Sequence, residues 1–153
     1  MTTLKLGTIE EELAAGRKAF EGIGAWAVVM HYHHDRWLEI ITVSPRCRIE
    51  TILKAKDESE QPLRLRLFRP YHGPFSPVLE KAGAVWREAW RELNACGSAW
   101  EKGWAAWEAA RVVWEEARVG QERACAEWEK ENPDAHAKFC TPGCPWNGKT
   151  IFG

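Results

Sequence analysis

The chain has 153 residues, the size of one ordinary domain or of a small domain with an appendage. Its 21 Lys and Arg against 22 Asp and Glu residues give a formal net charge of −1, which excludes a strongly basic chromatin-type protein and an acidic disordered tail. No apolar run approaches the roughly 18 to 20 residues that a membrane span needs, so no membrane partner is expected. Ten residues are Trp, and their positions along the chain bear on the predicted fold and function.

The cysteines indicate a compartment. There are five, an odd number, and the acidic beginning of the chain is unlike an export signal. We therefore expect a cytoplasmic protein without a disulfide framework.

The N-terminal segment predicts a helix followed by a hairpin. Thr8 with Glu11 three residues later forms a capping box, so a helix is expected over residues 9–20, ended by Gly22. Residues 24–32 and 36–43 are rich in β-branched and apolar side chains and predict two strands joined by a turn at residues 33–36.

The next segment adds a helix and a third strand. Ser44 and Pro45 are a helix start, with the helix expected to stop near residue 58. Over residues 63–69, Leu alternates with Arg, which is typical of a half-exposed strand. Residues 1–70 are therefore predicted to form an α-β-β-α-β domain with a small antiparallel sheet, and the fold class is α+β.

After a Pro-rich linker at residues 71–76, residues 77–131 predict a long helix. Large residues recur every seven positions with small residues opposite, which is typical of coiled-coil packing. Because the flanking residues are mostly Glu and Ala rather than Lys and Arg, we interpret the Trp residues as a packing or self-association surface rather than a base-stacking one. These residues are Trp86, Trp90, Trp100, Trp104, Trp107, Trp114 and Trp128.

One alternative is open within this helix. Gly97 followed by Ser98 and Glu101 is a helix stop running into a second capping box, which favours a helical hairpin. The heptad register that continues through Gly97 favours one continuous helix, about 80 Å long, which is the preferred prediction. Such a rod could bury its apolar stripe only by self-association.

The tail at residues 132–153 carries the best candidate site. His136 and Cys140 lie four residues apart, and a Pro-Gly turn brings Cys144 back toward them, a set that suits a structural zinc ion. A fourth ligand is required, and Cys125 or a distant His could supply it. The alternative is a pair of free thiols or an opportunistic disulfide. Asn147-Gly148 predicts a closing β-hairpin.

Two further groups of residues are candidate binding or catalytic sites. His31 and His33 point the same way on an extended strand, as in metal-binding His-x-His pairs, and would serve a small metal-dependent enzyme. Arg64, Arg66 and Arg69 line the predicted third strand, where a nucleic-acid phosphate or an acidic partner could dock.

Three stretches of the chain resemble a group of proteins. These are residues 49–54 with 63–70, the Trp- and Ala-rich helix, and the ending that runs from Cys140 to Phe152. Together they resemble uncharacterised small phage and metagenome proteins in which such helices precede a Cys-Pro-Trp-Asp/Asn-Gly-Lys/Arg-Thr-Ile-Phe motif. The resemblance implies a mobile-element origin and the cytosol of a host, and it assigns no site residues.

These observations favour a non-enzymatic protein-interaction or assembly protein, such as a phage accessory factor that binds a host or phage protein. The alternative is a nucleic-acid-binding accessory protein that uses the Arg64, Arg66 and Arg69 face and a zinc-stabilised tail.

Overall fold

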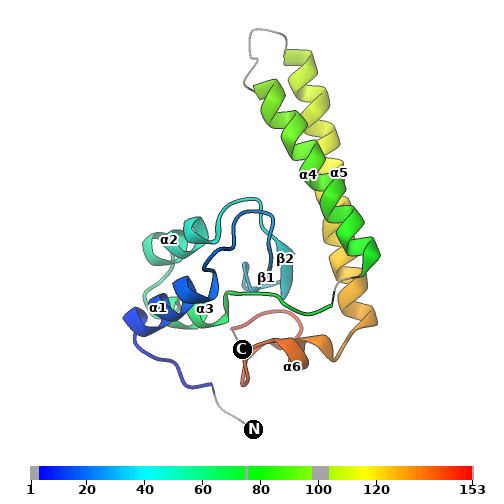
Figure 1. Cartoon of the computed structure of the whole chain (residues 1–153). Helices are drawn as coiled ribbons and strands as arrows, with labels where there is room; N and C mark the ends of the chain where they lie inside the picture. Colours follow the sequence, from blue (N-terminus) through cyan, green and yellow to red (C-terminus); the bar gives the residue numbers. More distant parts are fainter. Residues whose placement is uncertain (1–3, 75, 98–103, 153) are drawn as a thin grey trace. The chain divides into compact units, whose positions relative to one another are not determined.

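The computed structural model describes residues 4–74, 76–97 and 104–152, and the chain divides into two units. One unit combines Met1–Gly73 with Pro133–Gly153, and the other is Pro74–Asn132 (Figure 1). The C-terminal segment therefore belongs to the same unit as the N-terminal sheet, although more than 50 residues of the second unit separate them in sequence.

The first unit has the predicted α+β character. Its sheet is antiparallel, in the order β2-β1-β3, and Val29 at its centre is paired with Glu39 on one side and Pro70 on the other. The hairpin between the first two strands is thus confirmed. The elements of the unit are α1 (Ile9–Ala19), β1 (Val28–Met30), β2 (Leu38–Ile40), α2 (Pro45–Ala55), α3 (Gln61–Leu67), β3 (Arg69–Pro70) and α6 (Ala135–Phe139).

The predicted helix starts are confirmed. The Thr8 hydroxyl accepts the Glu11 amide at 3.3 Å while the Glu11 carboxylate accepts the Thr8 amide at 2.8 Å, so the capping box at α1 is complete. α2 begins at Pro45, as expected, and ends at Ala55, before the predicted residue 58, because Lys56 turns to an extended conformation.

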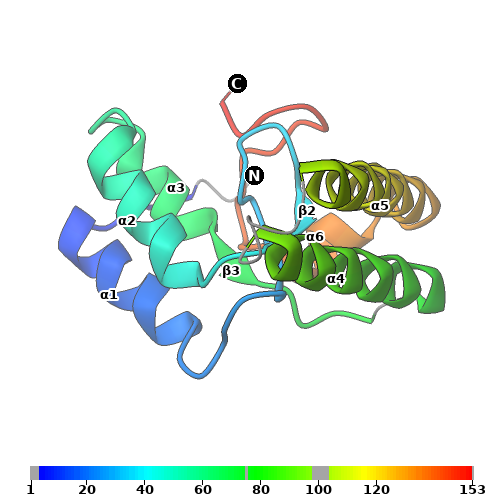
Figure 2. The ribbon, with the colours of Figure 1, turned by 90° about the horizontal axis from the view of Figure 1, so that it is seen from above.

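The core lies where α1, α2 and α3 meet β1. Val29, Ile52, Leu65 and Phe68 are each exposed by 1 % or less, and the Phe20 and Phe68 rings lie 4.5 Å apart. Figure 2 shows the three helices grouped together. Burying each large side chain stabilises the fold by about 1.5 to 3 kcal/mol, so this cluster is the main source of stability in the unit.

The prediction of a strand over residues 63–69 is wrong. Residues 61–67 form α3, and only Arg69 and Pro70 pair with β1. The Leu and Arg alternation is misleading because this short helix is buried on most sides: Leu65 and Leu67 are buried, and so is Arg64, which precedes them. Long Arg stems can cover apolar surface while their charged ends reach a partner, so alternation here does not separate an inner from an outer face.

The guanidinium group of Arg66 reaches a buried carboxylate. Glu12 of α1 is 1 % exposed, and its Oε1 accepts hydrogen bonds from Arg66 Nε at 3.0 Å and from the Gly7 amide at 2.7 Å. Arg66 Nη2 lies 2.7 Å from the same oxygen. The ion pair therefore ties α3 to α1 in the core of the unit.

We expect Glu12→Ala to lower the free energy of unfolding by about 3 kcal/mol. Removing one partner of a buried pair costs about 3 to 5 kcal/mol, and the low end applies because the Arg66 side chain is 34 % exposed and can regain water. Urea denaturation of the full chain measures the effect. Glu10→Ala, on the exposed side of the same turn, is the control and should change it by less than about 0.5 kcal/mol. Equal losses in the two variants would contradict the assignment.

The second unit is a helical hairpin, so the preferred prediction of one continuous helix is wrong. α4 (Pro77–Gly97) and α5 (Trp104–Glu131) pack against one another along their lengths (Figure 1). The Ser76 hydroxyl accepts the Leu79 amide at 3.2 Å and so caps the start of α4. The predicted second capping box at Ser98 and Glu101 falls outside the described residues. In the described part of the chain, no helix has the length and apolarity needed to cross a membrane.

The tryptophan stripe lies largely within this hairpin. Trp90 of α4 contacts Trp114 of α5, with ring centroids 5.8 Å apart, and Trp86 and Trp128 are buried. Trp107 is half-buried, with Arg111 over its ring at 6.0 Å. Trp100 and the Trp104 side chain are not in the described part. A hairpin can bury such a stripe against itself, so the stripe no longer requires a second chain.

Candidate metal centre

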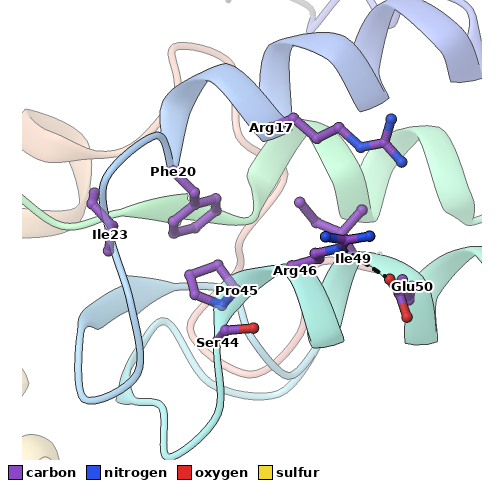
Figure 3. A pocket seen from close by; sticks show the side chains of 8 residues that line it. All are labelled: Arg17, Phe20, Ile23, Ser44, Pro45, Arg46, Ile49 and Glu50. Atoms are coloured by element: carbon purple, nitrogen blue, oxygen red, sulfur yellow. Dashed lines mark hydrogen bonds and ion pairs between the residues drawn. The ribbon is translucent and has the colours of Figure 1, made fainter.

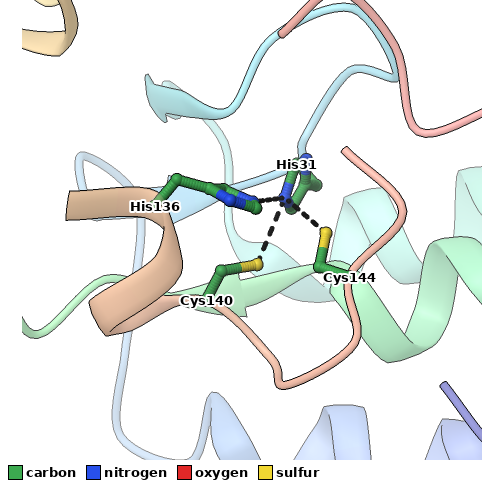
Figure 4. A group of neighbouring side chains, drawn as sticks. All are labelled: His31, His136, Cys140 and Cys144. Carbon is green, nitrogen blue, oxygen red and sulfur yellow. Dashed lines mark hydrogen bonds between the residues drawn. The ribbon is translucent and has the colours of Figure 1, made fainter. Parts of the chain in front are cut away.

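Four side chains that can bind a metal converge in the first unit. They are His31, His136, Cys140 and Cys144, and one ligand atom from each lies within 4.8 Å of all the others (Figure 4). His31 and Cys140 are buried, and the other two are half-buried. Three of the four were predicted from their spacing; the fourth comes from more than 100 residues away.

His31 reaches the cluster through an uncommon backbone conformation. It follows β1 directly and has a φ of 53°, in the left-handed region that non-glycine residues seldom adopt. This turn ends the strand alternation and aims the imidazole at the C-terminal segment. Because strained conformations persist where the surroundings hold them, and often at functional sites, this outlier supports a role for His31.

The other three ligands come from one short helix and the turn after it. His136 lies in α6 and Cys140 caps its end, with the Cys140 amide donating to the His136 carbonyl at 2.9 Å, so both side chains face the same way. The Cys144 amide donates to the Thr141 carbonyl at 3.0 Å, and Gly143 has a φ of 79°. With Pro at its second position, this is a type II turn, which returns Cys144 to the cluster as predicted.

The three distances from His31 to the other ligand atoms are compatible with a tetrahedral zinc ion. Zn–N bonds of about 2.05 Å and Zn–S bonds of about 2.3 Å place two nitrogens about 3.3 Å apart and a nitrogen about 3.6 Å from a sulfur. His31 Nε2 lies 3.4 Å from His136 Nε2, 3.4 Å from Cys140 Sγ and 3.5 Å from Cys144 Sγ. The cluster can therefore hold a metal ion, and its donors and spacing are compatible with a structural zinc.

The pKa values of the two thiols are displaced in opposite directions. Hydrogen bonds from Cys140, then from His136 and His31, lower the pKa of Cys144. The hydrogen bond to Cys144 and burial raise the pKa of Cys140. One thiolate is thus stabilised by the protein, and the second thiol keeps its proton until a cation offsets the added charge.

Aromatic side chains enclose the cluster. Trp37 is 3 % exposed and meets the His136 ring edge-on at 5.4 Å, and Trp146 lies 5.5 Å from the His31 ring. Tyr71 contacts both Trp37 and Phe139 of α6. This packing fixes the imidazoles and limits the access of water. The buried His31 Nδ1 has no hydrogen-bond partner among the described residues, so aromatic packing and the contacts of Nε2 orient this ring.

The segment after Cys144 anchors the tail to the same unit. The Asn147-Gly148 turn forms, with the Asn147 side-chain oxygen accepting the Lys149 and Thr150 amides at 2.9 Å. The flanking strands predicted for this hairpin are absent from the described residues 140–152, because Ile151 instead donates its amide to the His34 carbonyl at 3.0 Å. The Ile151 side chain is 2 % exposed.

The predicted His31 and His33 pair is wrong. The left-handed turn at His31 separates the two rings, and His33 Nδ1 instead lies 2.8 Å from the Glu39 carboxylate. Cys125, one of the two proposed fourth ligands, lies in α5, where its sulfur accepts the Gln121 amide at 2.8 Å. The fourth ligand is the distant His.

The three arginines of the predicted nucleic-acid face make contacts within the chain. Arg64 lies 2.8 Å from Glu60 and over the Phe152 ring at 4.9 Å, and Arg66 binds Glu12. Arg69 donates to the Leu65 and Phe68 carbonyls. Because the segment is a helix and its guanidinium groups have partners in the chain, these three arginines do not form the exposed basic strand face that was predicted to bind nucleic acid.

A separate cavity lies between α1 and α2 in the same unit (Figure 3). Its volume is about 440 Å³, and Phe20, Ile23 and Ile49 form its apolar lining. Arg17 lies at its edge, and Arg46 there is paired with Glu50 at 3.2 Å. The cavity shares no lining residue with the metal-binding cluster.

No protein family, no curated protein and no solved structure matches this chain. What can be inferred about function therefore comes from the residues themselves.

Proposed function

We propose that this protein is a non-enzymatic interaction module in which a zinc ion fastens the C-terminal segment to the α+β unit and the helical hairpin presents a protein-binding surface. The observation that carries the metal part is the closed set of four protein donors at tetrahedral spacing. A catalytic zinc site keeps one position open for water or substrate, whereas a structural site fills all four with side chains.

The position of the ligands supports a structural role. His31 lies at the end of the central strand, and the other three lie in the last 20 residues of the chain. A bound ion would link these segments across 105 residues of sequence. The unit has only three short strands and a modest core, and small domains of this kind commonly depend on a metal for stability.

The interaction part is supported by the outer face of the hairpin. Val78, Val85 and Val113 are 65 %, 54 % and 49 % exposed, a concentration of apolar side chains that is unusual for a surface with no partner. A mobile-element setting, in which the partner is a host or phage protein, is also part of the proposal and rests on the resemblance of the C-terminal motif.

Elemental analysis of the purified full chain tests the metal part. We expect about one zinc per chain after gel filtration at neutral pH, because structural zinc binds tightly there. Less than about 0.2 zinc per chain, with no uptake on titration of the reduced protein with zinc, would overturn it.

The interaction part is tested by affinity capture with the zinc-loaded chain as bait, in a lysate of the organism that encodes it. A Val113→Glu bait is the comparison, and a Val112→Glu bait is its control, since Val112 is similarly exposed but lies outside the groove described next. A protein retained by the control and lost with Val113→Glu supports the proposal. If no protein is lost selectively and the chain does not self-associate, the interaction part fails.

A further inference from the structure

The hairpin carries an apolar groove along one side of its α4–α5 contact. The groove has a volume of about 560 Å³, and its lining includes the exposed Val78, Val85 and Val113 and the small Ala82, Ala117 and Gly120. A Cβ placed on Gly120 would meet nothing within 4 Å, so the groove is open at that point. Valines beside small residues provide both the protrusions and the hollows that helix packing needs.

Positively and negatively charged residues lie at different levels along this groove. The Trp90 and Trp114 rings are 5.8 Å apart, and counting residues from this contact places Lys81 within about one helical turn of the level of Arg123. The same count places Glu88, which lies beside the groove and outside its lining, near the level of Glu116. Two positive residues therefore lie near one level and two negative residues near another, about seven residues or 10 Å along the helices.

The centre of the groove lies between these two levels. In α4, Val85 follows Lys81 by four residues and precedes Glu88 by three. In α5, Gly120 follows Glu116 by four residues and precedes Arg123 by three. Among the described residues, Lys81, Glu116 and Arg123 form no ion pair within the chain, whereas the exposed Glu88 pairs with Arg91 at 2.8 Å. Glu127 lies one turn beyond Arg123, at the outer limit of the groove.

We infer that the groove binds the same groove of a second copy of this chain, about a two-fold axis that passes close to Val85 and Gly120. This inference rests on the proposed function and names its partner. An isologous contact requires a surface that is complementary to itself. An antiparallel two-fold arrangement places the positive level of each copy against the negative level of the other, with the valines and the open Gly120 at the centre.

The charge order also selects this arrangement over a parallel one. If two hairpins packed in parallel, Lys81 would lie beside Arg123 of the other copy and Glu88 beside Glu116, so like charges would meet at both levels. In the antiparallel arrangement, Glu116 of each copy lies beside Arg123 of the other, and Lys81 beside Glu88. Like-charge contacts in an interface act against the wrong register, so the sequence disfavours parallel docking.

Sedimentation equilibrium of the zinc-loaded full chain with Val113→Glu tests the inference. Val113 precedes Gly120 by seven residues and Glu127 follows it by seven, so the new carboxylate would lie beside Glu127 of the other copy. Because the substitution enters the dimer twice, we expect the dimer dissociation constant to rise at least about 100-fold. Val112→Glu, the adjacent valine outside the groove, should change it less than about threefold.

Charge reversal provides the decisive comparison. Glu116→Arg alone and Arg123→Glu alone each bring like charges together in the antiparallel dimer and should each weaken it at least about tenfold. The double variant restores opposite charges, and its dissociation constant should return to within about threefold of the wild type. Failure of the double variant to recover would overturn the two-fold arrangement.

A wild-type chain that stays monomeric at about 100 μM overturns the inference as a whole, because it sets the dimer dissociation constant well above that concentration. The dimer and the interaction role can be distinguished by experiment. A monomeric chain that still captures another protein, and loses it with Val113→Glu, would support the proposed interaction role while showing that the occupant of the groove is a different protein.

Discussion

Removing zinc should unfold the α+β unit. We expect the full chain treated with a strong chelator to lose the near-ultraviolet circular dichroism that Trp37 and Trp146 contribute at the cluster, together with the cooperative thermal transition of this unit. Apparent binding free energies of structural zinc are about 10 to 16 kcal/mol in small zinc-dependent domains, whereas whole domains are stable by only about 5 to 15 kcal/mol. The loss of the ion therefore exceeds what the small core can offset.

A pair of cysteine variants separates zinc from thiol chemistry in general. Cys144→Ser removes a ligand and should lower the zinc content to less than about 0.2 per chain and reproduce the chelated state. Cys47→Ser is the matched control, since Cys47 is exposed and lies outside the cluster, and it should keep one zinc and the wild-type transition. If the two variants have the same zinc content and the same thermal transition, the assigned site is wrong.

Local chemistry made much of this structure predictable. The Thr8 cap of α1, the Pro45 start of α2, the turn between β1 and β2, and the Pro142-Gly143 turn each depend on a few neighbouring residues, and the structure has them where the sequence predicted them. The three C-terminal ligands were predictable for the same reason, because a four-residue spacing and a turn suffice to bring them together. The Ser44 hydroxyl, expected to cap α2, makes no capping hydrogen bond.

Periodicity misled in two places, for physical reasons. The Leu65 and Leu67 alternation fits a strand, but it also fits a short helix whose Arg side chains are held at Glu60 and Glu12. The heptad count continues from α4 into α5 because Gly97 and Trp104 are seven residues apart. A repeat records the spacing of side chains along the chain, and it does not record whether the helix axis has reversed.

The fourth ligand required the tertiary structure. His31 follows a run of apolar strand residues, and this run was the one sign in the sequence that His31 is buried. The extended geometry expected there paired it with His33 instead. Only the left-handed turn at His31 and the return of the C-terminal segment to the sheet bring it to the three other ligands. The same return explains the ending of the chain, in which Ile151 and Phe152 anchor the segment that carries the cysteines.

Substituting this distant ligand should therefore be as damaging as substituting a local one. We expect His31→Asn to weaken zinc binding more than 100-fold, because even the outer hydrogen-bond partners of zinc ligands are worth 10- to 100-fold in metal affinity. Competition with a chromophoric chelator measures the affinity of the reduced full chain. The side chain is 4 % exposed, so the variant is also expected to lower the thermal transition of the unit.

His33→Asn is the control that the sequence itself offers. It lies two residues away, its ring contacts Glu39 and Tyr32 outside the cluster, and its side chain is 49 % exposed, so zinc affinity should change less than about threefold. If His33→Asn lost zinc as fully as His31→Asn, the strand geometry expected from sequence would be correct and the assigned cluster wrong. If His31→Asn kept wild-type affinity, the site would hold its ion with three ligands, and the closed structural site on which the non-enzymatic proposal depends would be excluded.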